Sequence, residues 1–274
     1  MVIDAHTHHT RRGYLNDSWW DGIGSAIARR TGRNKDEATA ELVGRVERET
    51  GDAFIPAMDA AGIDVMVTMG LDWSFQIGES SISFQQQNLE QYDLAKKHPD
   101  RILAFASIEP RRGKEGLEFF ERSVKDLGAK GLKLHPCSGW FANDPAAYPF
   151  YAKAVELDVP IVSATQTTRQ GFVSTDIGLE DTSESFGLPA TADLMFALIS
   201  NEELDELNQI AVKQLKNRYN DLTVNKRFVI GIDRTKMQLF DIKLEEQNDL
   251  VDSNQTEFAE PVFDTTDFGE DWKG

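Results

Sequence analysis

The sequence predicts an α/β protein, in which an incomplete TIM-like (β/α) barrel is followed by a mixed-sheet fragment and a disordered acidic tail. Three observations predict this fold class. Over residues 1–162, short apolar strand segments alternate with longer helical segments, which is typical of a parallel sheet. After residue 162 the strand-like segments are joined by short or hairpin-like connections. From Lys243 onward there are ten acidic residues against two lysines, and few apolar residues.

About five strand–helix units are expected in the first domain, residues 1–162. The expected strands are residues 2–5, 65–69, 102–106, 131–134 and 159–162. Helices are expected where apolar residues return every three or four positions, at residues 36–49, 84–97, 114–127 and 145–157. The long connection after the first strand is interpreted as an insertion over a strand end. A closed eight-stranded barrel needs about 250 residues and three more units, so we expect an open partial barrel.

The second domain, residues 163–242, is expected to follow a different plan. A polar stretch that ends at Ser185 predicts a mobile loop. Strands are expected at residues 194–199, 209–215, 227–232 and 237–241, with one helix at residues 202–207 and a turn at Asn220–Asp221. Residues 243–274 form the tail, which we expect to be disordered.

Composition excludes some functions and leaves others open. The net charge of −17 argues against a large cationic surface for nucleic acid, but about half of the excess lies in the tail, so a local DNA-facing strip stays possible. No apolar run approaches the length of a membrane span, and because residues 1–6 already have strand character we expect no signal peptide. The single cysteine, Cys137, excludes an internal disulfide and fits a reducing compartment. We therefore expect a cytoplasmic protein without a membrane partner.

A pair of histidines follows the first expected strand. Because residues i and i+2 of an extended chain face the same side, His6 and His8 can point together into a barrel mouth and share one metal ion. Asp4 follows the same alternation and could fix a histidine tautomer from the outer shell. The alternative interpretation is a surface histidine cluster without a ligand, since a bare His-x-His pattern is common.

Several segments of residues 1–162 resemble the metal-dependent amidohydrolase family, which includes decarboxylases of the amino-carboxymuconate-semialdehyde type. The matching segments are VIDAHTH at 2–8, HPDR at 98–101, ASIEPRRG at 106–113, KGLKLHP at 130–136 and DPAAYP at 144–149. The resemblance implies that His6 and His8 are metal ligands, most often for zinc. It also implies that the open barrel top binds a small carboxylated or amide substrate.

The chain departs from that family after the fourth strand. The family carries further ligands after its later strands, including a histidine after strand five, whereas here residues 162–165 read VSAT and no histidine follows His135. A catalytic zinc usually has three protein ligands and one open position, so two histidines are expected to hold the ion weakly. His135 could be a third ligand, but a substrate-lining or structural role is the favoured interpretation.

The second domain resembles the C-terminal end of hexameric replicative helicases of T-even-like phages and cyanophages, with a RecA-like core. The matching segments are SATQTTR at 163–169, DTSES at 181–185, KQLKNR at 213–218 and FVIGID at 228–233. The resemblance implies that Gln166 senses the γ-phosphate of a nucleotide. It implies that Lys216 and Arg218 reach the ATP of a neighbouring subunit, and that residues 182–185 lie near single-stranded DNA. Without the family, the Lys216–Arg218 segment would be an ordinary solvated strand end.

The composite chain is expected to have neither full activity alone. No GxxxxGK[ST] phosphate-binding loop precedes the helicase-like segment, so ATP and Mg²⁺ would act only within intact helicase subunits. Three hypotheses stay open at this point. The first is a residual zinc-dependent hydrolase or carboxy-lyase, the second is a module that docks onto helicase subunits or DNA, and the third is a fusion without function.

Overall fold

The computed structural model describes residues 1–162, 164, 166–167, 177–181, 190, 192–236 and 238–242. The chain divides into two units, unit 1 (Met1–Val162) and unit 2 (Ser163–Gly274). The expected disordered tail at 243–274 lies outside the described residues, as does most of the expected loop that ends at Ser185. In the described part of the chain, no helix has the length and apolar character that a membrane span requires.

Unit 1 is built on a parallel sheet, as the sequence predicts. Its strands are β1 (Ile3–Thr7), β2 (Val65–Thr68), β3 (Ile102–Ser107) and β4 (Gly131–Lys133). They lie in sequence order, and each pairs in parallel with the next. The sheet is therefore open, with β1 and β4 as its two edges, and it matches the first part of a (β/α) barrel.

The expected fifth strand at residues 159–162 is wrong, because the structure shows no strand there. Val159 is buried in the core of unit 1, whereas Ile161 is 54% exposed, so packing accounts for only one of the apolar residues that suggested a strand. Pro160 has no backbone N–H to donate to a neighbouring strand. Val162 is 93% exposed. The sheet of the described unit thus has four strands, one fewer than we expected.

Helices follow the strands of unit 1 in an alternating order. They are α1 (Asp17–Thr31), α2 (Lys35–Arg48), α3 (Phe54–Ala61), α4 (Ser74–Ile77), α5 (Phe84–Lys97), α6 (Gly113–Lys125) and α7 (Tyr148–Glu156), with short 3₁₀ turns at Gly51–Ala53, Pro110–Arg112 and Pro136–Ser138. Three of them begin after a side chain that caps their first backbone N–H groups: Asn16 for α1, Asn34 for α2 and Ser83 for α5. The expected helix at residues 84–97 is confirmed at both ends, and the other three are confirmed within about three residues.

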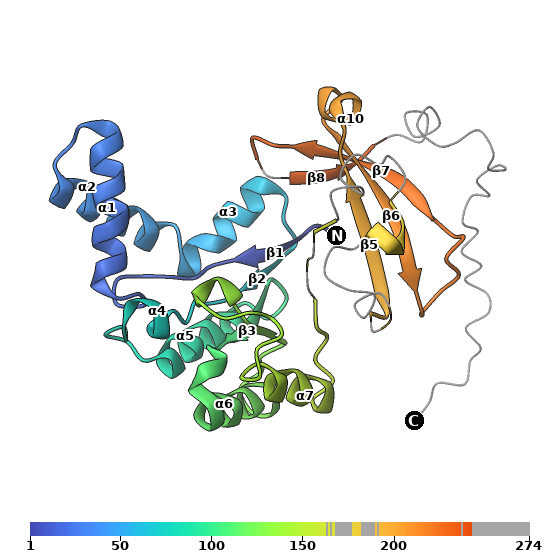
Figure 1. Ribbon diagram of the computed structural model, residues 1–274. Coiled ribbons are helices and arrows are strands. Elements are labelled where there is room, and N and C mark those ends of the chain that lie inside the picture. Colours follow the sequence, from blue (N-terminus) through green and yellow to red (C-terminus); the bar gives the residue numbers. More distant parts are fainter. Residues whose placement is uncertain are drawn as a thin grey trace. The chain divides into compact units, whose positions relative to one another are not determined.

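The insertion after β1 is a helical hairpin. Helices α1 and α2 pack against each other beyond the carboxyl end of β1 (Figure 1). Gly24 of α1 lies so close to Thr39 of α2 that a Cβ atom at position 24 would fall 1.8 Å from the Thr39 hydroxyl oxygen. The hairpin therefore depends on glycine at the helix crossing. This hairpin lies in the long connection after the first strand, which the sequence predicts to be an insertion over a strand end.

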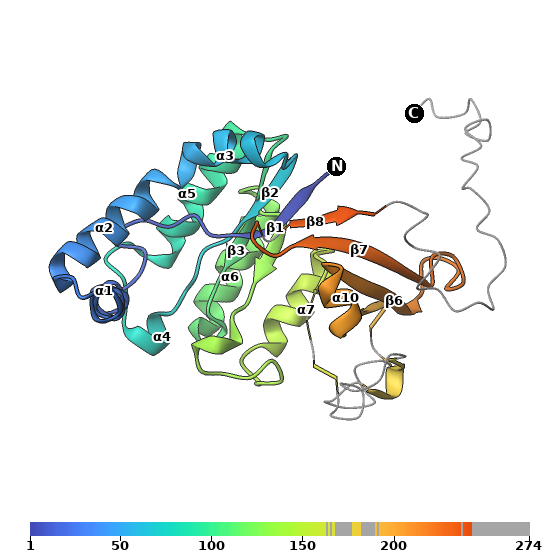
Figure 2. The ribbon, with the colours of Figure 1, turned by 90° about the horizontal axis from the view of Figure 1, so that it is seen from above.

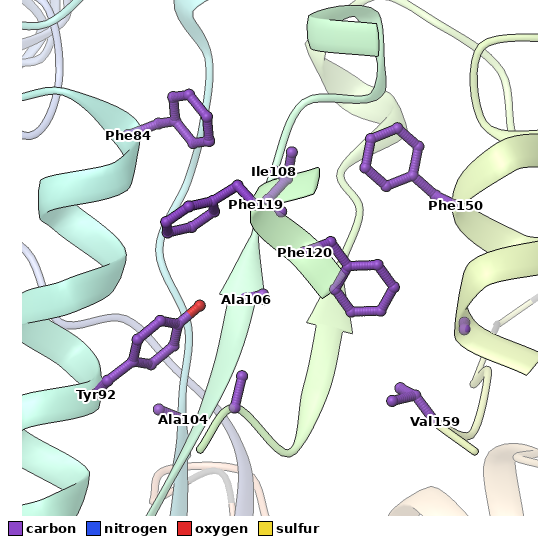
Figure 3. Close-up of a cluster of buried hydrophobic side chains, with 11 residues drawn as sticks. Phe84, Tyr92, Ala104, Ala106, Ile108, Phe119, Phe120, Phe150 and Val159 are labelled. Atoms are coloured by element: carbon purple, nitrogen blue, oxygen red, sulfur yellow. The ribbon is translucent and has the colours of Figure 1, made fainter. Parts of the chain in front are cut away.

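The main core of unit 1 lies on one face of the sheet. Helices α5 and α6 pack against β3, and α7 packs against α6 (Figure 2). Figure 3 shows the aromatic side chains of these helices around Ala104 and Ala106 of β3. The rings of Phe120 and Phe150 stack with centroids 6.5 Å apart, while Phe84 and Phe119 meet edge to face. Small residues on the strand thus leave room for large aromatic rings on the helices.

Unit 2 contains an antiparallel sheet. Its strands are β5 (Leu194–Ile199), β6 (Gln209–Asn217), β7 (Arg227–Asp233) and β8 (Gln238–Asp241), in that order, with α10 (Glu202–Glu206) between β5 and β6 and a 3₁₀ turn at Leu179–Asp181. The expected strand positions are confirmed, but every described pair is antiparallel, so the mixed sheet that we expected is wrong for these four strands. The short connections account for the difference, because consecutive strands joined by tight turns pair antiparallel.

Candidate metal and anion site

His6 and His8 meet at the carboxyl end of β1. Their Nε2 atoms are 3.1 Å apart, and their rings meet edge to face with centroids 4.8 Å apart. His6 belongs to the strand itself rather than to the residues after it. The register against β2 shifts between Asp4 and Thr7, so this end of the strand is irregular. The structure nevertheless brings together the two imidazoles that the alternation predicts.

The tautomer of His8 follows from its hydrogen bond. His8 Nδ1 lies 2.9 Å from the carbonyl oxygen of Met69, just after β2. A carbonyl oxygen only accepts, so the proton is on Nδ1 and the lone pair is on Nε2. Metal-binding histidines usually donate their other ring N–H to a carbonyl or carboxylate in this way. His8 is thus oriented to bind an ion through Nε2.

The spacing of the two nitrogens suits one shared ion. With metal–nitrogen bonds of about 2.0–2.1 Å, a separation of 3.1 Å corresponds to an angle of about 100° at the metal. Within the described ranges, no group of three or more His, Cys, Asp or Glu side chains is arranged to hold a metal ion. The residues therefore fit a two-histidine attachment but do not form a complete catalytic centre.

Asp4 does not contact a histidine ring, contrary to our expectation. Its Oδ1 accepts from the backbone N–H of His6 at 3.1 Å, and its Oδ2 accepts from the Thr7 hydroxyl at 2.9 Å. The carboxylate thus stabilises the irregular end of β1. The outer-shell group that fixes a ring is instead the Met69 carbonyl, which no sequence pattern could have indicated.

Burial and nearby cations favour neutral histidines. Burial is the largest cause that lowers the pKa of His6 and of His8, and the Lys133 ammonium lowers both further. Lys133, at the end of β4, places its Nζ atom 3.5 Å from His6 Nε2. Burial also lowers the pKa of Lys133 itself. Near neutral pH the two imidazoles are therefore unprotonated, as metal binding requires.

His135 lies just beyond β4 and faces a tryptophan. The indole N–H of Trp73 donates to His135 Nδ1 at 2.8 Å, and the two rings stack with centroids 5.5 Å apart. No hydrogen bond or ring contact joins His135 to His6 or His8 in the described part of the chain. Its pKa is lowered by burial first and then by the charges of Lys133, His8 and His6, so these groups share one end of the sheet.

Two buried ion pairs hold the loops that carry Trp73 and His135. Asp72 accepts from Arg112 at both carboxylate oxygens, with distances of 2.5 and 3.0 Å. Glu109 accepts from Arg111 Nε at 2.7 Å and from the Ser138 hydroxyl at 2.5 Å. Both acidic side chains are almost fully buried. The loop after β2 and the loop after β4 are thus anchored to the loop after β3.

The helicase-like residues lie in unit 2. Lys216 Nζ and Arg218 Nη2 both donate to the carbonyl oxygen of Ala190, at 3.1 and 3.2 Å. Arg218 also pairs with Asp193 at 2.8 Å, and both side chains of this pair are about half exposed. Gln166 is exposed. The structure brings Lys216 and Arg218 together, while the expected DNA-facing segment at 182–185 lies outside the described residues.

Comparison with known proteins identifies the family. The sequence model of the amidohydrolases matches residues 3–225, which is well over half of the chain. The chain belongs to the amidohydrolase family. The match extends beyond residue 162, so it overlaps the segment in which the sequence also resembles phage helicases.

Solved structures of amidohydrolase-type enzymes are similar in part. A 5-carboxyvanillate decarboxylase from Novosphingobium aromaticivorans DSM 12444, complexed with manganese and a nitrobenzoic acid, is 19% identical with a TM-score of 0.41, over 61% of this chain and 51% of the enzyme. A 2,6-dihydroxybenzoate decarboxylase from Rhizobium is 20% identical with a TM-score of 0.36, also over 61% and 51%. This amidohydrolase chain therefore spans about half the length of those enzymes.

A curated relative confirms the second resemblance. The chain is 36% identical over 108 residues to a DnaB-like replicative helicase of Enterobacteria phage T4, which is 38% of this chain and 23% of the helicase. The match covers under a quarter of the helicase, so this chain is similar to only a part of that protein.

Sequence reasoning missed two groups of the site. Lys133 and His135 stand two residues apart at the end of a strand, which is the same signal that indicated His6 and His8. Lys133 could therefore have been found. Trp73 gave no such signal, because it contacts His135 only through the fold.

Proposed function

We propose that the chain binds one divalent metal ion through His6 and His8, as an incomplete amidohydrolase-type centre. The convergence of the two Nε2 atoms, with the His8 ring oriented by Met69, is the observation that carries this proposal. Bound there, the ion would act as a Lewis acid toward a small carboxylated or amide substrate. His6 and His8 would hold it, and Lys133 would lie beside it. Two protein ligands hold an ion less firmly than the usual three, so we expect weak binding and little or no turnover by this chain alone.

Titration of the metal-free chain with Zn²⁺ and Mn²⁺ tests the proposal. Calorimetry at pH 7 is expected to show one ion per chain and a rise in the thermal midpoint. Replacing His8 by alanine should weaken binding by more than about tenfold, because a direct ligand is lost. Lowering the pH to 5 should also weaken it, since protons compete for the two imidazoles.

His98→Ala is the matched control for the metal titration. His98 lies before β3, where its Nε2 is 3.1 Å from Asp52 Oδ1, and it has no contact with the proposed ligands. Its removal should leave metal affinity unchanged. Binding that persists in a chain with both His6 and His8 replaced by alanine would disprove the two-histidine site.

The second candidate function is association with replicative helicase subunits, supported by the helicase similarity over 108 residues. In that role Lys216 and Arg218 would act at a neighbouring subunit's nucleotide, with ATP and Mg²⁺ supplied by the intact helicase. Their present contacts with Ala190 and Asp193 would have to exchange for the phosphates. The exposed Arg218–Asp193 pair contributes little stability, so this exchange has a small cost.

Mixing the purified chain with intact phage T4 helicase tests the second candidate. Co-elution on size exclusion in the presence of ATP and single-stranded DNA is the expected result. Arg218→Ala should reduce it, whereas Lys236→Ala, which changes a lysine that pairs with Asp233, should not. Separate elution of the two proteins under all these conditions would rule out the association.

A further inference from the structure

The structure assigns His135 a role other than that of third metal ligand. We propose that Trp73 fixes His135 with its proton on Nε2, and that this N–H and the Lys133 ammonium together bind a carboxylate beside the His6–His8 pair. The inference deepens the proposed function, because it names the group that would orient a substrate at that site. It does not need the metal, so the two proposals can fail separately.

The tautomer of His135 follows from the donor that it faces. An indole nitrogen carries a hydrogen and has no lone pair to offer, so Trp73 Nε1 can only donate. His135 Nδ1, 2.8 Å away, must therefore accept, and it must be unprotonated. In the neutral ring the remaining nitrogen, Nε2, then carries the proton. Nδ1 is occupied by Trp73 and Nε2 has no free lone pair, so neither nitrogen is available to a metal ion.

Lys133 supplies the charge of this subsite. Its side chain is half-buried at the end of β4, and its charge lowers the pKa of His135, two residues later, so the two groups lie near each other. Among the described residues, no carboxylate lies within ion-pair distance of Lys133 Nζ, which lies 3.5 Å from His6 Nε2. A half-buried ammonium without an acidic partner is stabilised by a bound anion.

The nearby acidic groups are already engaged. Asp4 accepts from Thr7 and from the backbone of His6. Glu109 accepts from Arg111 and Ser138, at the base of the loop that holds His135. The carboxylates of this end of the sheet therefore have partners of their own, and the Lys133 ammonium stays available to an anion from outside the chain.

The charge balance favours a carboxylate over a phosphate. One ammonium and one neutral N–H match the single charge and two oxygens of a carboxylate. A phosphate dianion would need a second free cation, but Arg111 and Arg112, in the loop after β3, are paired with Glu109 and Asp72. Trp73, which also lies 6.4 Å from the ring of Trp19, adds an aromatic surface beside the donors. A planar aromatic acid fits this combination, so benzoate is the probe.

Benzoate titration of the full-length, EDTA-dialysed chain tests the subsite. Wild type is expected to bind benzoate more tightly than inorganic phosphate. Lys133→Met should weaken benzoate binding by about tenfold, because it removes a charged donor. Lys130→Met is the matched control, since Lys130 is an exposed lysine just before the same strand. A chain with His6 and His8 replaced by alanine should keep benzoate binding while losing the metal.

Nitrogen NMR of ¹⁵N-histidine-labelled chain tests the positioning role of Trp73. The His135 signals, assigned by comparison with His135→Gln, should show a protonated Nε2 and a bare Nδ1 in wild type. Trp73→Phe keeps an aromatic ring but removes the donor, so it should mix the two tautomers and weaken benzoate binding severalfold. A structural role alone would leave the ¹⁵N pattern unchanged.

Four results of the benzoate and NMR experiments would overturn the inference. They are no benzoate binding by wild type, equal binding by Lys133→Met and wild type, tighter binding of phosphate than of benzoate, and a proton on His135 Nδ1. Zn²⁺ titration that shifted a His135 nitrogen as a ligand would also overturn it, while leaving the His6–His8 proposal intact.

Discussion

Replacing Asp72 by alanine is expected to lower the free energy of unfolding by about 3–5 kcal/mol, because it leaves a buried guanidinium without its main partner. Arg112 and Asp72 are 9% and 5% exposed, and two hydrogen bonds join them. Arg112 also lies over the ring of Phe84, 4.0 Å from its centroid. With Asp72 gone, Arg112 would keep the Ser74 hydroxyl, at 2.8 Å, and the carboxylate of Glu79, which is at 3.1 Å and largely exposed.

Urea unfolding followed by tryptophan fluorescence measures this effect, since four of the five tryptophans lie in unit 1. Asp59→Ala is the matched control, because Asp59 also pairs with an arginine, Arg101, but is 60% exposed. It should cost no more than about 1 kcal/mol. If both variants lost the same small amount, the buried pair would not be an anchor of unit 1.

A double variant separates the ion pair from the cost of an unpaired charge. Replacing Arg112 by methionine together with Asp72→Ala removes both charges, so stability should recover relative to Asp72→Ala alone. In this double variant the overall stability should be restored, but the loop that carries Trp73 should still lack its ion pair with the loop after β3. The ¹⁵N signals of His135 in this variant would show whether the Arg112–Asp72 pair positions Trp73. A mixture of tautomers in a stable chain would mean that it does.

Local patterns were sufficient to predict most elements. The helix at residues 84–97 and the strand at residues 194–199 were predicted with the bounds that the structure shows, because apolar residues recur at helical spacing in the first and form a short continuous run in the second. The convergence of His6 and His8 was also predictable, since it depends on neighbouring residues of one strand. Each of these features is determined by residues that are close together in the sequence.

Features that depend on distant partners were not predictable in the same way. The segment at 159–162 has the apolar character of a strand, yet it forms none. The orientation of His8 by Met69 and of His135 by Trp73 joins residues about sixty positions apart. Asp4 was a candidate partner for a histidine ring, and it instead accepts from the backbone N–H of His6 in its own strand. Tertiary contacts decide these cases, and no local pattern records them.

Replacing Phe120 by alanine is expected to destabilise unit 1 by about 3–5 kcal/mol, which is the range for an aromatic side chain removed from a core. Phe120 on α6 is fully buried and stacks on Phe150 of α7. Phe120 belongs to one buried cluster with Phe150, Val159 and the small side chains of Ala104 and Ala106 (Figure 3), so its removal leaves a cavity in a packed core. The lost burial and the remaining void therefore add.

Phe141→Ala is the control for Phe120→Ala, because Phe141 is 79% exposed and should change stability by less than about 0.5 kcal/mol. Urea unfolding of both variants would measure the difference. The open sheet makes the effect of Phe120 large, since β1 and β4 have no further strand beside them in the described unit and the helix-covered face carries the main core. A loss below about 1 kcal/mol for Phe120→Ala would mean that this face is not what holds the four strands together.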